Sequence, residues 1–192
     1  MNETKISIIT VSFNAEKTIF KTIESINKQT YRNIEYIILD GKSKDKTLEV
    51  IEKTKKIPGL VKSEEDRSTE DAMNKSLRYA TGEIIFYLNS DDFLSDKNII
   101  SDVMEKFNQN KNIDIVYGNI EYFNHIKKKL TGRKFIPGKY IHGSYLKGWH
   151  APHPGFFIKK KYYEKFGGFN ENIKICPDFE IMFRFQELNK LN

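Results

Sequence analysis

The sequence of 192 residues predicts an α/β fold, an open sheet of buried strands with helices on both of its faces. Short apolar runs that do not alternate with polar residues are typical of strands buried on both sides. Between these runs, apolar residues recur at the i, i+4, i+7 spacing of amphipathic helices. The two patterns alternate through the first half of the chain, and this order favours parallel strands joined by covering helices.

The strands and helices follow from these patterns in chain order. Ser68-x-x-Asp71 has the form of a capping box, Asn14 is the expected cap of the first helix, and Gly82 stands where a helix should stop. Beyond residue 118 the pattern loosens into short β-like pieces. We expect strands at residues 6–11, 36–39, around 60–61, 84–88 and 113–117, and helices at 19–26, from about 46, 73–80, 99–107, 159–166 and about 181–188.

Composition places the chain among globular proteins, with 39% hydrophobic and 30% charged residues. We expect one domain with halves of about 1–96 and 97–192, and the last helix runs to the C-terminus without a stop signal, as in a C-terminally shortened chain. The longest apolar run, 84–88, is too short to span a membrane, and the N-terminus has no secretory signal. The single cysteine, Cys176, excludes a disulfide framework and is expected to be buried. We expect a cytoplasmic protein.

The net charge of +6 is unevenly distributed. Residues 1–96 contain 15 Lys and Arg against 17 Asp and Glu, whereas residues 97–192 contain 17 against 9. Within 121–165 only Glu121 and Glu164 oppose 11 basic residues. A basic face for an anionic partner and a solvated lysine-rich surface both explain this asymmetry.

Ligands of open α/β sheets bind beyond the carboxyl ends of the strands, so we examined the residues that follow each strand. Asp91 and Asp92 follow the strand at 84–88, and paired carboxylates at that place are typical of a Mg²⁺ or Mn²⁺ site. A turn with helix caps explains the same residues. Asp40 is explained either as an acceptor of a hydrogen bond from a base or ribose, or as part of a tight turn at Gly41. No dinucleotide-binding or P-loop motif is present, which disfavours those two kinds of nucleotide site.

Three further places contain chemically versatile side chains. Asp66 and Arg67 follow the third strand, and they are explained either as site residues at the edge of the sheet or as part of a solvated loop. Asp178 begins the last helix, either as its N-cap or as a general base held ionised there. His150 and His153 lie in a loop beside Trp149, where substrate binding is favoured over a metal site.

Five motifs in order resemble the inverting family 2 glycosyltransferases with the GT-A fold, of the branch that builds bacterial exopolysaccharide, capsule and O-antigen. The resemblance covers residues from about 6 to 184. The motifs are Ile8 to Asn14; Asp40-Gly41-x-Ser43-x-Asp45-x-Thr47; Ser63-Glu64-x-Asp66 with Asp71-Ala72-Met73-Asn74-Lys75; Ala80-Thr81-Gly82-Glu83 leading to Leu88-Asn89-Ser90-Asp91-Asp92; and His153-Pro154 through Gly167-Gly168-Phe169 to Asp178-Phe179-Glu180 and Arg184.

The resemblance implies an open mixed sheet, a nucleotide-sugar half at about 1–96 and an acceptor half at about 97–192. It implies Asp178 as the catalytic base and Asp91 with Asp92 as ligands of Mn²⁺ or Mg²⁺. The sequence departs from the family pattern at Asn89, where many members have the first acid of a DxD triplet. The implied donor-binding residues are Thr10, Val11, Ser12, Phe13, Asn14, Asp40, Asp66, Arg67, Asn74, Asn89, Ser90 and Asp91, and the implied acceptor-side residues are Trp149, His153 and Glu180.

The function that the resemblance implies is inverting transfer of a sugar from a nucleotide-diphosphate sugar, UDP by family habit, to a hydroxyl of a glycan or lipid-linked saccharide. A catalytically silent nucleotide-sugar-binding module and a nucleotidyltransferase are the alternatives. Nucleic-acid binding is not expected, because no RNA- or DNA-binding motif accompanies the basic segment. That segment instead predicts an electrostatic contact with the inner face of the cell membrane.

Overall fold

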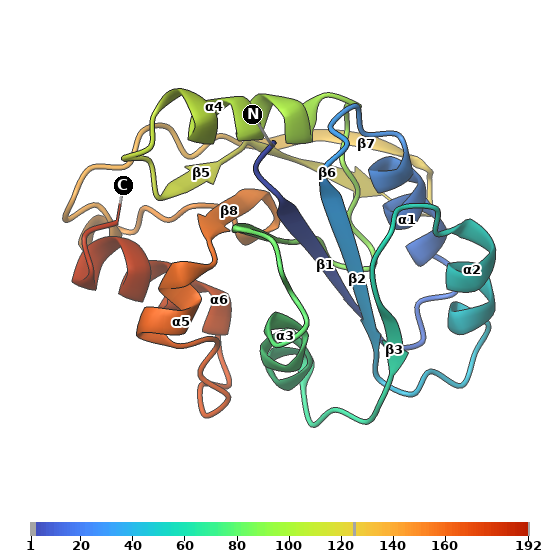
Figure 1. Ribbon diagram of the computed structural model, residues 1–192. Coiled ribbons are helices and arrows are strands. Elements are labelled where there is room, and N and C mark those ends of the chain that lie inside the picture. Colours follow the sequence, from blue (N-terminus) through green and yellow to red (C-terminus); the bar gives the residue numbers. More distant parts are fainter. Residues whose placement is uncertain (1–2, 125, 192) are drawn as a thin grey trace.

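The computed structural model describes residues 3–124 and 126–191, whose centre is a mixed sheet of six strands in the order β3-β2-β1-β4-β8-β5 (Figure 1). β1 pairs in parallel with β2 and β4, and β2 pairs in parallel with β3. β8 runs antiparallel to both β4 and β5, which makes the sheet mixed. The strands are β1 (Ile6–Ser12), β2 (Ile34–Asp40), β3 (Val61–Ser63), β4 (Ile84–Tyr87), β5 (Ile115–Tyr117) and β8 (Phe156–Lys159).

Helices cover both faces of this sheet, as the sequence predicts (Figure 1). Side chains alternate along each strand, so Ile8 and Phe86 enter one core while Ile9 and Tyr87 enter the other. The first core is closed by α1 (Ile19–Asn27), α2 (Thr47–Thr54) and α4 (Ile99–Gln109), and the second by α3 (Thr69–Leu77), α5 (Lys161–Phe166) and α6 (Pro177–Phe183).

A hairpin of β6 (Ile120–Asn124) and β7 (Lys129–Phe135) forms a separate two-stranded antiparallel sheet. It occupies part of the region where the sequence predicts short β-like pieces. Short 3₁₀ turns, η1 (Tyr145–Lys147) and η2 (His153–Gly155), follow before β8. No helix in the described parts of the chain is long and apolar enough to cross a bilayer.

Three local predictions about helix ends meet different outcomes. Ser68 caps α3 as expected, its Oγ accepting a hydrogen bond from the Asp71 N–H at 3.2 Å. Asn14 does not cap α1: Thr18 occupies that position, and the Asn14 Oδ1 accepts from the Lys44 N–H at 2.9 Å instead. Gly82 lies beyond the end of α3, and it is needed because a Cβ there would collide with the backbone of Ser7 in β1.

The C-terminal helix departs most from its prediction. It begins after Cys176, which is exposed and lies at φ 53°, so both the buried cysteine and Asp178 as the N-cap are wrong. After Phe183 the helix widens into a π-helical segment, Arg184–Leu188 (labelled η3), which the i, i+4, i+7 pattern did not predict. Within this segment the buried Glu187 accepts hydrogen bonds from the backbone N–H groups of Gly143 and Tyr145.

Candidate functional site

A cavity of about 330 Å³ opens where β1 and β4 end, beside the first turn of α3. Parallel strands bring their carboxyl ends to one edge of the sheet, which explains why residues far apart in sequence meet here. Six of the predicted donor-binding residues line it, together with two residues of α3 that the prediction missed. The lining residues are Val11, Ser12, Phe13, Asp66, Asn89 and Ser90, with Thr69 and Ala72 from α3.

Phe13 and Asp66 give this cavity its chemical character. The Phe13 ring is 63% exposed, which leaves an aromatic face available for stacking against a flat ligand such as a base. The Asp66 carboxylate packs against Gly41, where a Cβ would collide with its Oδ2. Burial and the neighbouring carboxylates of Asp71 and Asp40 raise the pKa of Asp66, against the opposing charge of Lys75.

Asp40 does not face the cavity. Its side chain is fully buried, and its two oxygens accept hydrogen bonds from the hydroxyls of Ser12, Ser43 and Ser63 and from the Ser43 N–H, at 2.5 to 3.2 Å. This carboxylate therefore joins β1, β2 and β3 at the floor of the site. Each Asp40 oxygen already accepts two hydrogen bonds, so none is left for the predicted contact with the nucleotide.

Thr10 and Asn14 are also occupied by the fold. The Thr10 Oγ1 donates to the Leu88 carbonyl at 2.8 Å and accepts from the Tyr36 hydroxyl at 3.1 Å. Asn14 is bonded to the loop after β2, as described above. Thr10 is also fully buried, and the Asn14 N–H donates to the Ser43 Oγ at 2.8 Å, so both residues serve the fold at this edge of the sheet.

A second cavity, of about 420 Å³, lies on the other side of the loop that follows β4. Asn89 and Ser90 face the first cavity, whereas Asp91 and Asp92 face the second, so this four-residue loop is the wall between them. Most of the second cavity is apolar. Its walls come from the loop after β4, from α4, from the β6–β7 hairpin and from Pro154 and Gly155.

The Asp91–Asp92 pair provides carboxylate oxygen but no complete metal cage. Asp92 is held by the Asn89 Nδ2, 3.3 Å from its Oδ2, and its carbonyl accepts from the Thr22 hydroxyl at 2.6 Å. No group of three or more His, Cys, Asp and Glu residues gathers anywhere in residues 3–124 and 126–191. Two carboxylates fit a Mg²⁺ or Mn²⁺ ion that takes its other ligands from substrate phosphates and water.

Asp178 is the second residue of α6, half-buried, and it accepts no hydrogen bond from the described chain. Its neighbour is His153, whose ring stacks 6.2 Å from Tyr87 and meets Phe169 edge-on at 5.7 Å. Burial lowers the pKa of His153, and the charge of Asp178 opposes that shift. The pair thus places a carboxylate with open acceptors beside a desolvated imidazole.

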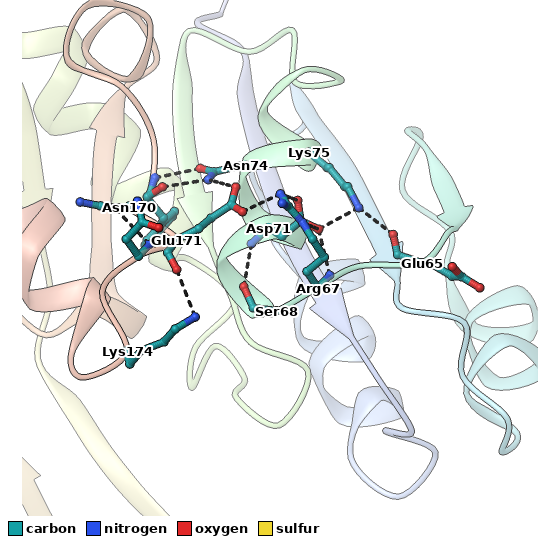
Figure 2. A network of polar contacts seen from close by, with 11 residues as sticks. Glu65, Arg67, Ser68, Asp71, Asn74, Lys75, Asn170, Glu171 and Lys174 are labelled. Carbon is teal, nitrogen blue, oxygen red and sulfur yellow. Dashed lines mark hydrogen bonds and ion pairs between the residues drawn. The ribbon is translucent and has the colours of Figure 1, made fainter.

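Arg67 and Asn74, both predicted to bind the donor, lie outside the cavity lining and have other partners (Figure 2). Asn74 bonds the backbone of Phe169 through its amide group, and Arg67 bridges Asp71 and Glu171. The three residues predicted on the acceptor side are similarly engaged. The Trp149 Nε1 donates to the Pro137 carbonyl at 2.5 Å, His153 lies in the aromatic stack, and Glu180 pairs with Arg184 at 2.7 Å.

The sequence matches the family described as Glycosyl transferase family 2 over residues 7–191. It is 27% identical over 188 residues to an uncharacterized glycosyltransferase of Mycobacterium tuberculosis, covering 93% of this chain and 68% of that protein. It is 33% identical over 148 residues to the UDP-Glc:α-D-GlcNAc-diphosphoundecaprenol β-1,3-glucosyltransferase WfgD of Escherichia coli, covering 77% of this chain and 57% of that protein.

Solved structures share the fold. TarS of S. aureus in complex with UDP-GlcNAc superposes with a TM-score of 0.77 at 20% identity, covering 94% of this chain and 52% of that one. The mannosyltransferase PcManGT of Pyrobaculum calidifontis, in complex with GDP-Man and Mn²⁺, superposes with a TM-score of 0.69 at 18% identity, covering 90% and 49%. The α/β architecture is therefore the GT-A fold, and the chain spans about half of each of these two structures.

Proposed function

The chain belongs to glycosyl transferase family 2, and from that premise we propose that it transfers a sugar from a nucleotide-diphosphate sugar to an acceptor hydroxyl, with inversion. The observation that carries this proposal is the cavity at the ends of β1 and β4, which has an exposed aromatic ring, Phe13, and a polar loop that leads directly to Asp91 and Asp92. A flat base can stack on such a ring, and a diphosphate can share a divalent cation with the two carboxylates.

The chain's own residues have distinct tasks in this reaction. Phe13 and Asp66 hold the nucleotide, and the loop from Asn89 to Asp92, which is the wall between the two cavities, holds the diphosphate. Asp178 takes the proton from the acceptor hydroxyl as it attacks the anomeric carbon and the nucleoside diphosphate departs. A single displacement inverts the configuration, because no second nucleophile intervenes.

Asp91 and Asp92 would hold a divalent cation, Mn²⁺ or Mg²⁺, which supplies charge neutralisation for the departing diphosphate when it is bound. UDP is the nucleotide we propose, because TarS is solved in complex with UDP-GlcNAc and the E. coli relative is a UDP-Glc glucosyltransferase. For the acceptor we propose a lipid-linked saccharide, the class named for the E. coli glucosyltransferase.

The experiment that tests this function measures binding first and turnover second. UDP-glucose, UDP-GlcNAc and GDP-mannose are screened by thermal shift with and without Mn²⁺, and a ligand at about 100 times its Kd should stabilise the fold by about 2.7 kcal/mol. The best donor is then incubated with a GlcNAc-diphosphate lipid, and the released nucleotide is identified. Release of nucleoside diphosphate supports glycosyl transfer, whereas release of pyrophosphate would establish nucleotidyl transfer.

Tight binding of a UDP-sugar without transfer or slow hydrolysis would instead make the protein a silent binding module. Asn89 favours this alternative, because an amide there replaces one carboxylate of the triplet that many family members have. Its Nδ2 is bonded to Asp92 and so takes part in the same loop.

A peripheral contact with the inner face of the cell membrane belongs to the same proposal. Lys127, Lys128 and Lys129 are exposed at the turn of the β6–β7 hairpin and form no ion pair in the described chain. Ile126 beside them is 94% exposed, which adds an apolar side chain to the charge. By contrast, Lys159 and Lys160, which lie farther along the same basic segment, are paired with Asp114 and Glu164.

We expect co-sedimentation with vesicles of anionic but not neutral lipid at low salt, lost as salt rises. Lys127, Lys128 and Lys129 changed together to Glu should abolish it. A matched triple change to Glu of the exposed Lys28, Lys53 and Lys56, which lie at the end of α1, in α2 and just after α2, alters the net charge equally and should retain it. Equal loss in both triples would contradict a contact through the hairpin.

A further inference from the structure

The segment between α5 and α6 leads directly into Asp178 and is mostly exposed. Asn170, Asn172, Lys174, Ile175 and Cys176 are all solvent-exposed, and Phe169 is the one residue of this stretch, among those described, that is buried in the core. A loop with so few apolar contacts is weakly fixed by packing. The position of the loop must therefore be set by polar contacts with other elements.

Those contacts converge on α3 and the residue just before it. Among the described residues, every hydrogen bond or ion pair that residues 169–176 make outside themselves and α6 goes to Asn74 or Arg67 (Figure 2). The Asn74 Oδ1 accepts from the Phe169 N–H at 2.8 Å, and its Nδ2 donates to the Phe169 carbonyl at 2.9 Å. One side chain thus bonds both backbone groups of the loop's buried residue.

Glu171 extends this attachment. Its Oε1 accepts from the Asn74 Nδ2 at 3.2 Å, and its Oε2 accepts from the Arg67 Nη2 at 2.6 Å. Arg67 is fixed in turn by Asp71, whose buried carboxylate also binds Lys75. The close fit requires Gly168, because a Cβ there would collide with the Asn74 Oδ1.

The same end of the loop, just before Phe169, is also tied to the helical segment that continues α6. The Arg184 guanidinium donates to the carbonyls of Phe166 and Gly168, at 2.6 and 2.7 Å, while it pairs with Glu180 on the same helix. The loop therefore cannot move relative to α6 without breaking the Arg184 bonds, or relative to α3 without breaking the Asn74 bonds. Since Thr69 and Ala72 of α3 line the first cavity, the contacts connect that cavity through α3, Phe169 and Arg184 to α6, the helix that contains Asp178.

We propose that Asn74 and Glu171 are positioning residues that set the position of Asp178 relative to the first cavity, where the donor binds in the proposed function. This inference rests on Asp178 being the base of the proposed function. It assigns to Asn74 a task different from donor binding, because its amide oxygen and nitrogen are both used on Phe169 and Glu171. A base displaced by about 1 Å loses about 10²-fold in rate, even when substrate binding is intact.

The test is Asn74→Asp, which keeps the shape and the acceptor for the Phe169 N–H. It removes the donor to the Phe169 carbonyl and sets a second carboxylate against Glu171. Turnover, measured as UDP released from a bound UDP-sugar, should fall about 10- to 100-fold, while the Kd for UDP changes by no more than about twofold. The double variant Asn74→Asp with Glu171→Gln restores a hydrogen bond of reversed polarity and should recover at least about fivefold of the loss.

Two controls separate this proposal from its rivals. Asn170→Ala, which removes only a hydrogen bond inside the loop, should leave turnover within about threefold of the native value. Asp178→Asn, measured alongside, tests the base itself, so unchanged turnover in that variant would overturn the base assignment whatever Asn74 does. The positioning proposal is overturned if Asn74→Asp weakens UDP binding in step with turnover, if it leaves turnover unchanged, or if the double variant shows no recovery.

Discussion

Asp40 and Asp71 differ sharply from Asp91 and Asp178 in how they are bonded, although all four lie around the same edge of the sheet. Asp40 and Asp71 are 0% and 3% exposed, and each accepts several hydrogen bonds from serine, arginine or lysine groups. Asp91 is exposed and Asp178 half-buried, and neither accepts a hydrogen bond from any residue in the described ranges.

The difference shows which carboxylates serve the fold and which are left for a ligand. Burying a carboxylate is costly unless donors replace the water that it loses, so a buried and fully bonded carboxylate stabilises a junction between segments. A carboxylate with open acceptors forms no such hydrogen-bonded junction in the free protein. It remains available to a proton, a cation or a hydroxyl of a substrate.

The largest effect expected from this comparison is at Asp178. Asp178→Asn preserves shape and breaks no hydrogen bond of the described chain, so the fold should keep its thermal stability. Turnover should fall about 10²–10⁴-fold, the usual contribution of a positioned base. Initial rates with a saturating UDP-sugar, together with a melting curve, measure both quantities. Near-native turnover would remove Asp178 from the mechanism.

Asp40→Asn is the converse experiment on the buried set. An amide in place of one oxygen turns an acceptor into a donor that faces other donors, and we expect the free energy of unfolding to fall by about 2–4 kcal/mol. Urea unfolding monitored by circular dichroism measures it. If stability is instead retained and UDP affinity falls, Asp40 contacts the nucleotide as the sequence resemblance implies.

Asp92→Ala tests the loop between the two cavities. We expect the stimulation of UDP binding by Mn²⁺ to fall by about tenfold, because one of two carboxylates available to the cation is removed. Isothermal titration with UDP, with and without Mn²⁺, provides the comparison. Asp96→Ala is the matched control in the same loop and should behave as the native protein, because the Asp96 carboxylate accepts from the Asn98 N–H alone among the described residues and the Gln29 bond to its carbonyl is kept.

The smallest effect is expected for Asp71→Asn, and it depends on pH. Hydrogen bonds from Arg67 and then Lys75 hold the pKa of Asp71 well below its ordinary value of 3.8, against the effect of burial. A lowered pKa in the folded state stabilises the fold above pH 3.8, and this stabilisation is lost as the pH falls toward the folded-state pKa. The variant should therefore be less stable than the native protein by about 1–3 kcal/mol at pH 7.

The difference between the two proteins should shrink as the pH falls below about 4, since the unfolded carboxyl then takes up its proton. Melting curves from pH 3 to pH 7 measure this trend. A constant difference across that range would mean that Asp71 stabilises the fold through shape alone. Such a result would place it outside the group of charged, bonded carboxylates.

Local pattern predicted most of the scaffold. Apolar runs located the five strands around residues 6–117 and the spacing of Ile19, Ile23 and Ile26 located α1, because the period of buried side chains is a property of one segment. The ordered motifs predicted the family, and six of the predicted donor residues lie in one cavity. Each of these inferences depends on residues that are close in sequence.

Tertiary structure decided which polar side chains are occupied. Asn74 and Asp40 look like site residues in the sequence, but Asn74 bonds Phe169, 95 positions away, and Asp40 bonds Ser12 and Ser63 from two other strands. Sequence alone also did not foresee the exposed Cys176 or the π-helical turn after Phe183. A side chain's chemistry is written in the sequence, whereas its remaining hydrogen-bonding capacity depends on partners that only the folded chain brings within 3 Å.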